Sequence, residues 1–481
     1  MMRLEDYLAL HACQSPQKVA VFSGGEECTY AEFYQRVQQR AAEIKNSFEA
    51  SECHSFRLEE TAIPFRSSQS IDFLVEYMGI HLAGAAAVPL EHDLPDDRYN
   101  EIVSLLSTVS VPEGSADVLF TTGTTGRSKG VIMSHRTIIA DAENLIDGQG
   151  FTPGIVFVIT GPLNHIGSLS KIWPVFMLGA TLYITGGMKN IEDFYTALEY
   201  VPSHVSPAGG VEQGERLQRY ATFLVPASIR MLLQLSHDRF AQYADRIDFL
   251  ETGAAPIMQS DMEELCRILP HSRLYNTYAS TETGIITTYN YNRQGADSTS
   301  PSAACLGRHM RHSRLFITPE GTIACQGPTL MTGYIGDPEL TATVLRDYQS
   351  PGALHPEPTL FTADRGMIDD EGRLHLLGRE DDVINVGGFK VAPTEVEDAA
   401  MSLPQVADCI CIAAAHPIVG RALKLLVVPA PGCDFDKRVV ARWLKTRLES
   451  YKVPLLYEQV DKVNRTYNGK LNRKAYRQRN G

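Results

Sequence analysis

The sequence predicts an α/β protein built in layers, and two observations support this fold class. Short apolar runs rich in β-branched residues alternate with stretches of helical periodicity through most of the chain, a pattern typical of strands and helices that pack as layers. The 481 residues correspond to about three structural units of roughly 150 residues each, enough for sizeable cores.

The individual elements follow from local signals. Thr29 and Glu32 form a T-x-x-E capping box, and apolar residues then recur at helical spacing, so a helix is expected to begin there. Segments 202–214 and 348–358 are rich in Pro, Gly or Ser and are expected to be loops or insertions. A domain boundary is expected near residues 378–382, where a strand-like run meets a charged cluster. Strand-like runs cover residues 117–121, 155–159, 222–225, 247–250 and 423–428.

The charge distribution argues against a nucleic-acid-binding protein. The whole chain has a formal net charge of −13, which disfavours bulk affinity for a polyanion. Residues 380–481 differ, because they carry 16 basic and 12 acidic side chains. This basic segment is either an ordinary solvent-exposed face or a surface that receives an anionic ligand.

Targeting signals and cysteine usage indicate a cytoplasmic protein without a membrane span. The first residues lack a basic region followed by an apolar stretch, so no signal peptide is predicted. The most apolar stretch, residues 79–90, is too short to cross a bilayer. The nine cysteines include no C-x-x-C pair and are expected to be reduced, structural thiols. Cys409 and Cys411 alternate within an apolar run and are expected on one face of a strand.

The strongest chemical signal is the segment TTGTTGRSKG at residues 121–130, which follows a predicted strand. Gly123, Gly126 and Gly130 would let the backbone approach an anion closely, while hydroxyl groups donate hydrogen bonds and Lys129 supplies positive charge. The segment does not fit a Walker A loop in any register. Taken alone, it could equally be the turn of a hairpin.

This segment resembles the phosphate loop of the adenylate-forming superfamily, which comprises acyl- and aryl-CoA ligases, adenylation domains and luciferases. The resemblance extends over essentially the whole chain, through five segments in the order of the family. It implies a large N-terminal domain of mixed sheets and helices at residues 1–379, which binds ATP and the acid. A small, mobile α+β domain would follow at residues 380–481. The loop residues that the resemblance assigns to nucleotide binding are Thr122, Gly123, Thr124, Thr125, Gly126 and Lys129.

Two further segments resemble nucleotide-binding motifs of the family. Residues 275–284 are similar to its Y-G-x-T-E motif, and residues 361–366 to its Y-x-T-G-D motif. The resemblance implies that Tyr278 packs on adenine, Thr281 contacts the α-phosphate, Glu282 holds Mg²⁺ and Asp364 binds the ribose hydroxyls. A carboxylate suits the hard Mg²⁺ ion, which offsets charge on the departing pyrophosphate. In isolation, Glu282 could be a helix cap and the Asp364 segment an ordinary turn.

The region after residue 378 resembles the hinge and the thiol tunnel of the family. The resemblance implies that Arg379 contacts the nucleotide and that Asp381 is the pivot. The residues that it places along the tunnel are Gly387, Gly388 and Lys390.

The last motif, at residues 468–474, resembles the family segment that carries the catalytic lysine, which here is Lys470. In isolation, Lys470 would be one more base in a basic tail. Pro393, followed by Glu395 and Glu397, independently predicts a well-capped helix start.

These motifs together imply an AMP-forming acid–thiol ligase that uses ATP, Mg²⁺ and CoA. A carboxylate is already a nucleophile, so forming the acyl-adenylate needs positioning and charge balance rather than a general base. Lys470 and Mg²⁺ would supply that charge. Rotation of the small domain would then remove Lys470 and bring the thiol to the acyl carbonyl.

The identity of the acid is constrained by the segment around His165, which resembles the family's gating histidine or aromatic residue. In relatives that activate amino acids an Asp normally follows this position, whereas here it is Ile166. An α-ammonium group would therefore be buried without a partner. The expected substrate is an aryl or medium-sized carboxylic acid, unless His165 is simply a satisfied core histidine. The small residues expected to line the pocket are Gly253, Ala254, Ala255 and Ala279.

Three alternatives remain open from the sequence. The acyl acceptor could be the phosphopantetheine of a carrier protein, which would use the same motifs. The chain could also be a non-catalytic nucleotide-binding paralogue, because Ser128, Ala279 and Ala363 depart from the family pattern. A luciferase-like oxygenase is disfavoured by the absence of any residue that identifies its acid. The oligomeric state is left open.

Overall fold

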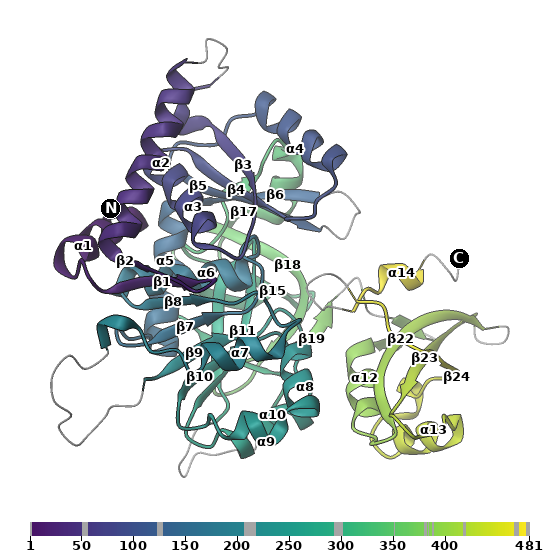
Figure 1. Cartoon of the computed structure of the whole chain (residues 1–481). Helices are drawn as coiled ribbons and strands as arrows, with labels where there is room; N and C mark the ends of the chain where they lie inside the picture. Colours follow the sequence, from purple (N-terminus) through teal and green to yellow (C-terminus); the bar gives the residue numbers. More distant parts are fainter. Residues whose placement is uncertain are drawn as a thin grey trace.

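The computed structural model places a large sheet-rich N-terminal domain beside a smaller C-terminal domain, which confirms the predicted fold class (Figure 1). The structure describes residues 2–50, 56–122, 128–205, 218–292, 302–350, 352–379, 382, 384–386, 389–416, 420–465 and 471–477.

A long mixed sheet runs through the N-terminal domain. Its central strands β7 to β11 pair in parallel, and from β12 onward the added strands are antiparallel. In spatial order its strands are β14 (Arg314–Ile317), β15 (Thr322–Gln326), β18 (Glu357–Ile368), β19 (Leu374–Arg379), β13 (Cys305–His309), β12 (Gly284–Asn290), β11 (Arg273–Ser280), β10 (Ile247–Thr252), β9 (Tyr220–Phe223), β7 (Val156–Ile159), β8 (Thr181–Ile184), β1 (Val19–Ser23) and β2 (Glu26–Thr29), with β17 (Leu345–Tyr348) beside β18.

A second, smaller sheet carries the predicted phosphate loop. Strands β5 and β6 form an antiparallel hairpin, and β3, β4 and β5 pair in parallel. Its strands, in spatial order, are β16 (Gly333–Tyr334), β6 (Ser128–Ser134), β5 (Ser115–Thr122), β4 (Ala86–Leu90) and β3 (Ala62–Arg66).

Helices cover both faces of the large sheet, as strand β7 illustrates. Phe157 and Ile159 belong to one hydrophobic core, whereas Val156 and Val158 belong to another. Because successive side chains of a strand point to opposite faces, this continuous apolar run is buried on both sides. The helices of the domain are α1 (Leu4–Gln14), α2 (Tyr30–Ala50), α3 (Ile71–Ala83), α4 (Asp96–Thr108), α5 (His135–Gln149), α6 (Ile166–Leu178), α7 (Ile191–Ala197), α8 (Pro226–Leu235), α9 (His237–Ala241), α10 (Gln259–Ile268) and α11 (Pro338–Val344).

The C-terminal domain has its own hydrophobic core, to which strands β22 and β23 and helices α12 and α13 contribute. Cys409 and Cys411 are both buried in this core on one face of β22, as predicted, and burial raises the pKa of both thiols. The elements are β20 (Ile384–Val386), β21 (Phe389–Val391), α12 (Pro393–Met401), β22 (Val406–His416), β23 (Gly420–Pro429), α13 (Lys437–Lys445), β24 (Leu456–Gln459) and α14 (Lys474–Arg477).

Most local sequence predictions are confirmed. The backbone N–H of Thr29 donates to Glu32 at 2.9 Å, and α2 begins at the next residue. One strand is displaced toward the N-terminus: β9 ends at Phe223 rather than 225, because Pro226 begins α8. The predicted loop at 348–358 corresponds to the connection between β17 and β18, but Tyr348 still belongs to β17 and residues 357–358 already belong to β18. Most of the predicted loop at 202–214 lies outside the described residues.

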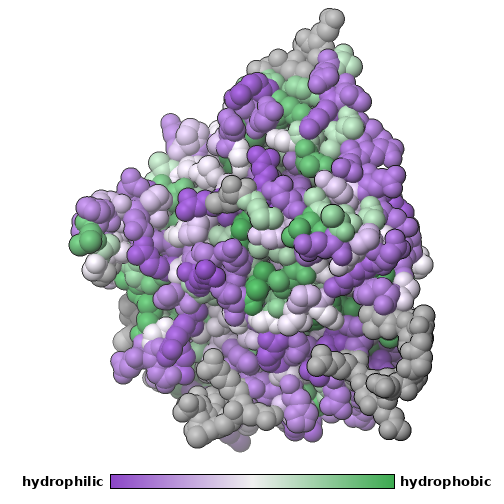
Figure 2. Space-filling model, turned by 90° about the vertical axis from the view of Figure 1, so that its left-hand side faces the viewer, coloured by the Kyte–Doolittle hydropathy of each residue, from purple (hydrophilic) through white to green (hydrophobic). Residues whose placement is uncertain are grey.

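Within the described ranges, no helix is both long and apolar enough to cross a bilayer. On the face seen in Figure 2, hydrophobic residues form patches bounded by hydrophilic ones.

Candidate active site

The predicted phosphate loop is the turn of the β5–β6 hairpin, with Thr121 paired to Lys129. Residues 123–127 lie outside the described part of the chain, as do the side chains of Thr122 and Ser128. Packing also requires a glycine at position 130. A Cβ atom there would lie 2.6 Å from Cγ2 of Ile335, so the neighbouring side chains leave no room for a larger residue.

Glu282 lies in the tight turn between β11 and β12, not at the start of a helix. The turn is closed by Ser280 and Thr283, each of whose backbone N–H groups donates to the hydroxyl of the other at 3.1 Å. The backbone N–H of Met331 donates to the carbonyl of Glu282 at 2.9 Å. The carboxylate therefore projects from a fixed backbone, with Thr281 beside it in the same turn.

Tyr334 brings Glu282 and Lys129 into one site. Its hydroxyl donates to Oε1 of Glu282 at 3.1 Å, and Nζ of Lys129 lies 5.2 Å from the centre of its ring. Burial, together with the charge of Glu282, raises the pKa of Tyr334, so the phenol stays protonated and remains a donor. The predicted metal-binding carboxylate and the predicted phosphate-binding lysine therefore share one neighbour.

A second group of predicted residues meets close to this turn, where Tyr278 of β11 faces Asp364 of β18. The hydroxyl of Tyr278 donates to Oδ2 of Asp364 at 2.7 Å, and Nε of Arg379 lies 3.6 Å from Oδ1 of the same carboxylate. Strand pairing fixes this contact, because Asp364 of β18 lies opposite Arg379 of β19. Burial and the neighbouring carboxylate raise the pKa of Tyr278. The sequence analysis predicted that each of these three residues contacts the nucleotide.

The predicted acid pocket has two walls joined by a residue that the sequence analysis missed. His165 is the N-cap of α6, and Gly253 follows β10. A Cβ on Gly167 would lie 3.1 Å from the ring of Phe223, and one on Gly253 would lie 3.6 Å from the same ring. Phe223 therefore lies between the segment that contains His165 and Ile166 and the segment 253–255.

Ala254, in the second wall, has a φ of +66°, a left-handed conformation that costs about 1–2 kcal/mol for a residue with a Cβ. Among the described residues other than glycine, no other has a positive φ. Such strain persists only where the surrounding structure fixes it, and it clusters at functional sites. Ala279, near the end of β11, packs against the same hydrophobic core as Phe223.

Behind this region lies a buried ion pair. Nζ of Lys171 in α6 is 2.8 Å and 2.7 Å from the two carboxylate oxygens of Glu251 in β10, and both side chains are 1% exposed. Nζ of Lys171 also lies 5.3 Å from the centre of the Phe223 ring. The sequence hinted at these residues, because Lys171 and Glu251 each place a charge within an apolar run. It did not show that the two residues pair with each other.

The C-terminal domain holds its terminal segment through a second buried pair. Arg473 donates to both carboxylate oxygens of Glu397 at 2.7 Å and lies 3.6 Å from Asp382, next to the predicted pivot. Glu397 is thus a partner of Arg473 rather than a capping residue, and only Glu395 lies in the first turn of α12. Asp381, Gly387, Gly388, Lys470 and the side chain of Lys390 lie outside the described residues.

The sequence profile of AMP-binding enzymes matches residues 107–335, and that of the AMP-binding enzyme C-terminal domain matches residues 395–470. Together these matches cover well over half of the chain. The chain belongs to the AMP-binding enzyme family. The predicted superfamily, the adenylate-forming enzymes, is confirmed.

Individual relatives agree with this AMP-binding assignment. A feruloyl-CoA synthase from an Amycolatopsis species is 26% identical over 98% of this chain and 97% of its own. The 4-coumarate-CoA ligase 2 of Narcissus pseudonarcissus is 25% identical over 76% of this chain and 62% of its own. The crystal structure of ATP-bound MatB from Rhodopseudomonas palustris has the same fold, with a TM-score of 0.80 and 21% identity over 99% of both chains. The predicted enzyme class, an AMP-forming acid–thiol ligase, is confirmed.

Proposed function

We propose that this enzyme activates an aryl or medium-sized carboxylic acid as its acyl-adenylate and transfers the acyl group to CoA. The observation that carries the proposal is the meeting of Lys129 and Glu282 at Tyr334. A cation on a glycine-rich hairpin and a carboxylate on a fixed turn give opposite charges around one point, which suits a metal–phosphate group. The curated relatives named above are CoA ligases.

Magnesium fits the donor chemistry at this point. Glu282 offers hard carboxylate oxygens, and Tyr334 orients one of them by hydrogen bonding. When bound, the ion would offset the charge of the phosphates during pyrophosphate release. The chain itself would contribute Lys129 and the hairpin amides to the phosphates, and Thr281 to the α-phosphate.

The nucleoside would be held by the second group of residues, which comprises Tyr278, Asp364 and Arg379. Tyr278 orients the carboxylate of Asp364 from one side, which leaves this acceptor pre-organised for the ribose hydroxyls. Arg379 now lies beside Asp364 and would be free to turn toward the phosphates when the ribose takes its place. The ring of Tyr278 would pack on adenine.

The pocket walls support an acid that has no α-ammonium group. Ile166 is apolar, and the carboxylate of Glu251 behind the pocket is already neutralised by Lys171. A buried ammonium group would gain no counter-charge from either residue, which costs several kcal/mol. His165 would gate the pocket, and the small residues at 253–255 leave room for a ring.

For the second step we propose the domain boundary at residues 379 and 380, with Asp381 as pivot. Adenylation would use Lys470, and the thiol would enter along Gly387, Gly388 and Lys390 after the small domain rotates. The excess of basic residues in that domain supports an anionic acceptor such as CoA.

A pyrophosphate-release screen over carboxylic acids, run with and without CoA, tests the proposal. We expect release with aryl acids, and an acyl-CoA product when CoA is present. A panel of phosphopantetheinylated carrier proteins tests the alternative acceptor, and thioester formed only on a carrier would refute the CoA assignment. Stereospecific activation of an α-amino acid would refute the assignment of the acid, and no release with any acid would favour the non-catalytic paralogue.

A further inference from the structure

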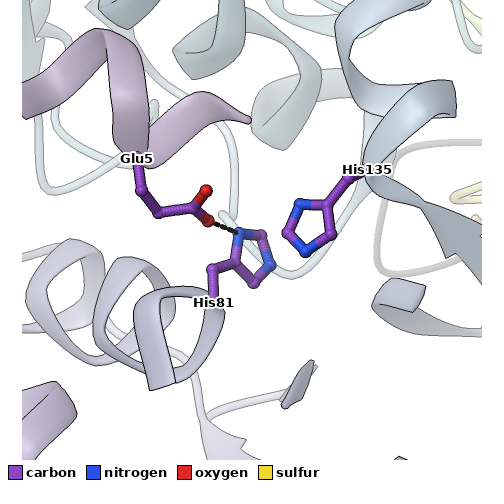
Figure 3. Close-up of side chains that lie close together, drawn as sticks. All are labelled: Glu5, His81 and His135. Carbon is purple, nitrogen blue, oxygen red and sulfur yellow. Dashed lines mark ion pairs between the residues drawn. The ribbon is translucent and has the colours of Figure 1, made fainter. Parts of the chain in front are cut away.

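A cluster of metal-ligating side chains lies inside the N-terminal domain, apart from the site described above. Glu5 of α1, His81 of α3 and His135 at the start of α5 converge from three different helices (Figure 3). Their residues are 3%, 0% and 7% exposed. One possible ligand atom of each lies within 4.8 Å of those of the others.

The facing atoms of Glu5 and His81 lack hydrogen-bond partners. Oε1 of Glu5 and Nδ1 of His81 form an ion pair at 3.0 Å, drawn as the dashed line in Figure 3, without the alignment of a hydrogen bond. Within the described chain, neither carboxylate oxygen of Glu5 nor Nδ1 of His81 has any other such partner. Buried polar atoms without hydrogen bonds are costly, so three of them at one point, two of which make only an ion pair, call for an explanation.

The other ring nitrogen of His81, Nε2, is held by a network of hydrogen bonds. Its Nε2 lies 2.9 Å from Oδ1 of Asp117, whose other oxygen accepts from the hydroxyl of Tyr77 at 2.9 Å. The indole N–H of Trp173 donates to that same hydroxyl at 3.1 Å. A carboxylate that fixes one imidazole nitrogen while the other nitrogen faces a site is the usual arrangement behind a metal-bound histidine.

We propose that Glu5, His81 and His135 bind a zinc ion. Two imidazoles and one carboxylate form a ligand set that suits Zn²⁺, whereas Mg²⁺ and Ca²⁺ prefer oxygen ligands alone. The charges agree, since the ion would neutralise the buried carboxylates of Glu5 and Asp117.

The proposed ion would be structural. It would join α1 to α3 and α5, and through Asp117 it would support β5, the strand that leads into the phosphate-loop hairpin. The alternative is a metal-free network in which a protonated His81 bridges Glu5 and Asp117. Burial opposes that charge, but the two carboxylates outweigh it and raise the pKa of His81 to about 10.

The metal content of the untagged, full-length protein distinguishes a zinc site from the metal-free network. After incubation with ZnCl₂ and dialysis, elemental analysis should find one zinc ion per chain, and His135→Gln should lose it. His11→Gln is the matched control, because His11 lies on α1 and contacts the carbonyl of Met177 outside the cluster. Circular dichroism checks that both variants fold.

The parent protein gives a second readout that needs no variant. A chelator should lower its melting temperature, and added ZnCl₂ should restore it by an amount that grows with the concentration of free ion. Cobalt in place of zinc should give intense visible bands of a low-coordinate site. Zinc near background in the parent, with a melting temperature that a chelator leaves unchanged, would overturn the proposal in favour of the proton-bridged network. Equal zinc content in the parent and His135→Gln would overturn the ligand assignment.

Discussion

Replacement of Arg473 by methionine should strongly destabilise the C-terminal domain. The guanidinium makes two bonds of 2.7 Å to Glu397, which is 5% exposed, and a third of 3.1 Å to the carbonyl of Cys411. Without it, the backbone N–H of Cys411, at 2.6 Å, is the one hydrogen-bond donor to the buried carboxylate that remains within the described residues. Breaking a buried pair in this way costs about 3–5 kcal/mol, a large share of the roughly 5–15 kcal/mol that stabilises a typical domain.

The effect should depend on pH with a defined sign. Burial already raises the pKa of Glu397 above its ordinary value, against the pull of Arg473, and Arg473→Met should raise it further. The folded state then holds a proton more tightly than the unfolded state. The penalty is therefore absent below the ordinary glutamate pKa of about 4.3. It grows as pH rises through the folded-state pKa, and it is complete above that value.

Denaturant unfolding at several pH values, followed by fluorescence, measures this penalty. Trp443 lies in α13 of the same domain and contacts α12, and a Trp443→Phe variant identifies its share of the signal. The double variant Glu397→Leu with Arg473→Met is the matched control. It removes both charges, and such replacements are often neutral or stabilising. A double variant as unstable as the single one, or a penalty independent of pH, would refute the reasoning.

Three further predictions concern the proposed active site. Asp364→Ala should weaken binding of an ATP analogue by about 1.5–3 kcal/mol in calorimetry. Tyr278→Phe should weaken it by about 0.5–1.5 kcal/mol, because only one of several hydrogen bonds is lost. Equal affinities for the parent and both variants would contradict the ribose assignment. Lys470→Ala should slow pyrophosphate release by about 10²–10³ yet form thioester from a prepared acyl-adenylate at the parental rate; equal losses in both steps would mean a structural lysine. Gly130→Ala should lower stability by about 1–3 kcal/mol through overpacking, whereas Gly154→Ala, with no atom within 4 Å of the new Cβ, should be tolerated in thermal unfolding.

Local features of the fold could be predicted from the sequence because their causes are local. The capping box at Thr29 and Glu32 needs only residues three apart, and the hairpin at 121–130 needs only its own turn composition. The burial of Cys409 and Cys411 on one face follows from strand alternation. Strand order could not be predicted in this way, because β1 pairs with β8 across a long stretch of chain.

The candidate site, too, could be predicted from the sequence only in part. Residue types at motif positions led to Glu282, Asp364 and Lys129, but the residue that joins two of them, Tyr334, belongs to no motif and comes from a strand of two residues. Phe223 was missed as well, because it matters through its proximity to Gly167 and Gly253, which are distant from it in the chain. Glu397 was misread because its position near a helix start suits capping, while its partner lies in the terminal segment.

The buried pair of Lys171 and Glu251 limits how this enzyme can evolve. Losing either charge alone would leave the other buried and unpaired at a cost of about 3–5 kcal/mol, a large share of the roughly 5–15 kcal/mol that stabilises a typical domain. Exchange of both for apolar residues avoids that cost, but it requires two simultaneous codon changes in helix α6 and strand β10. Stepwise mutation is thus barred here, and a library meant to reshape the pocket must vary both positions together.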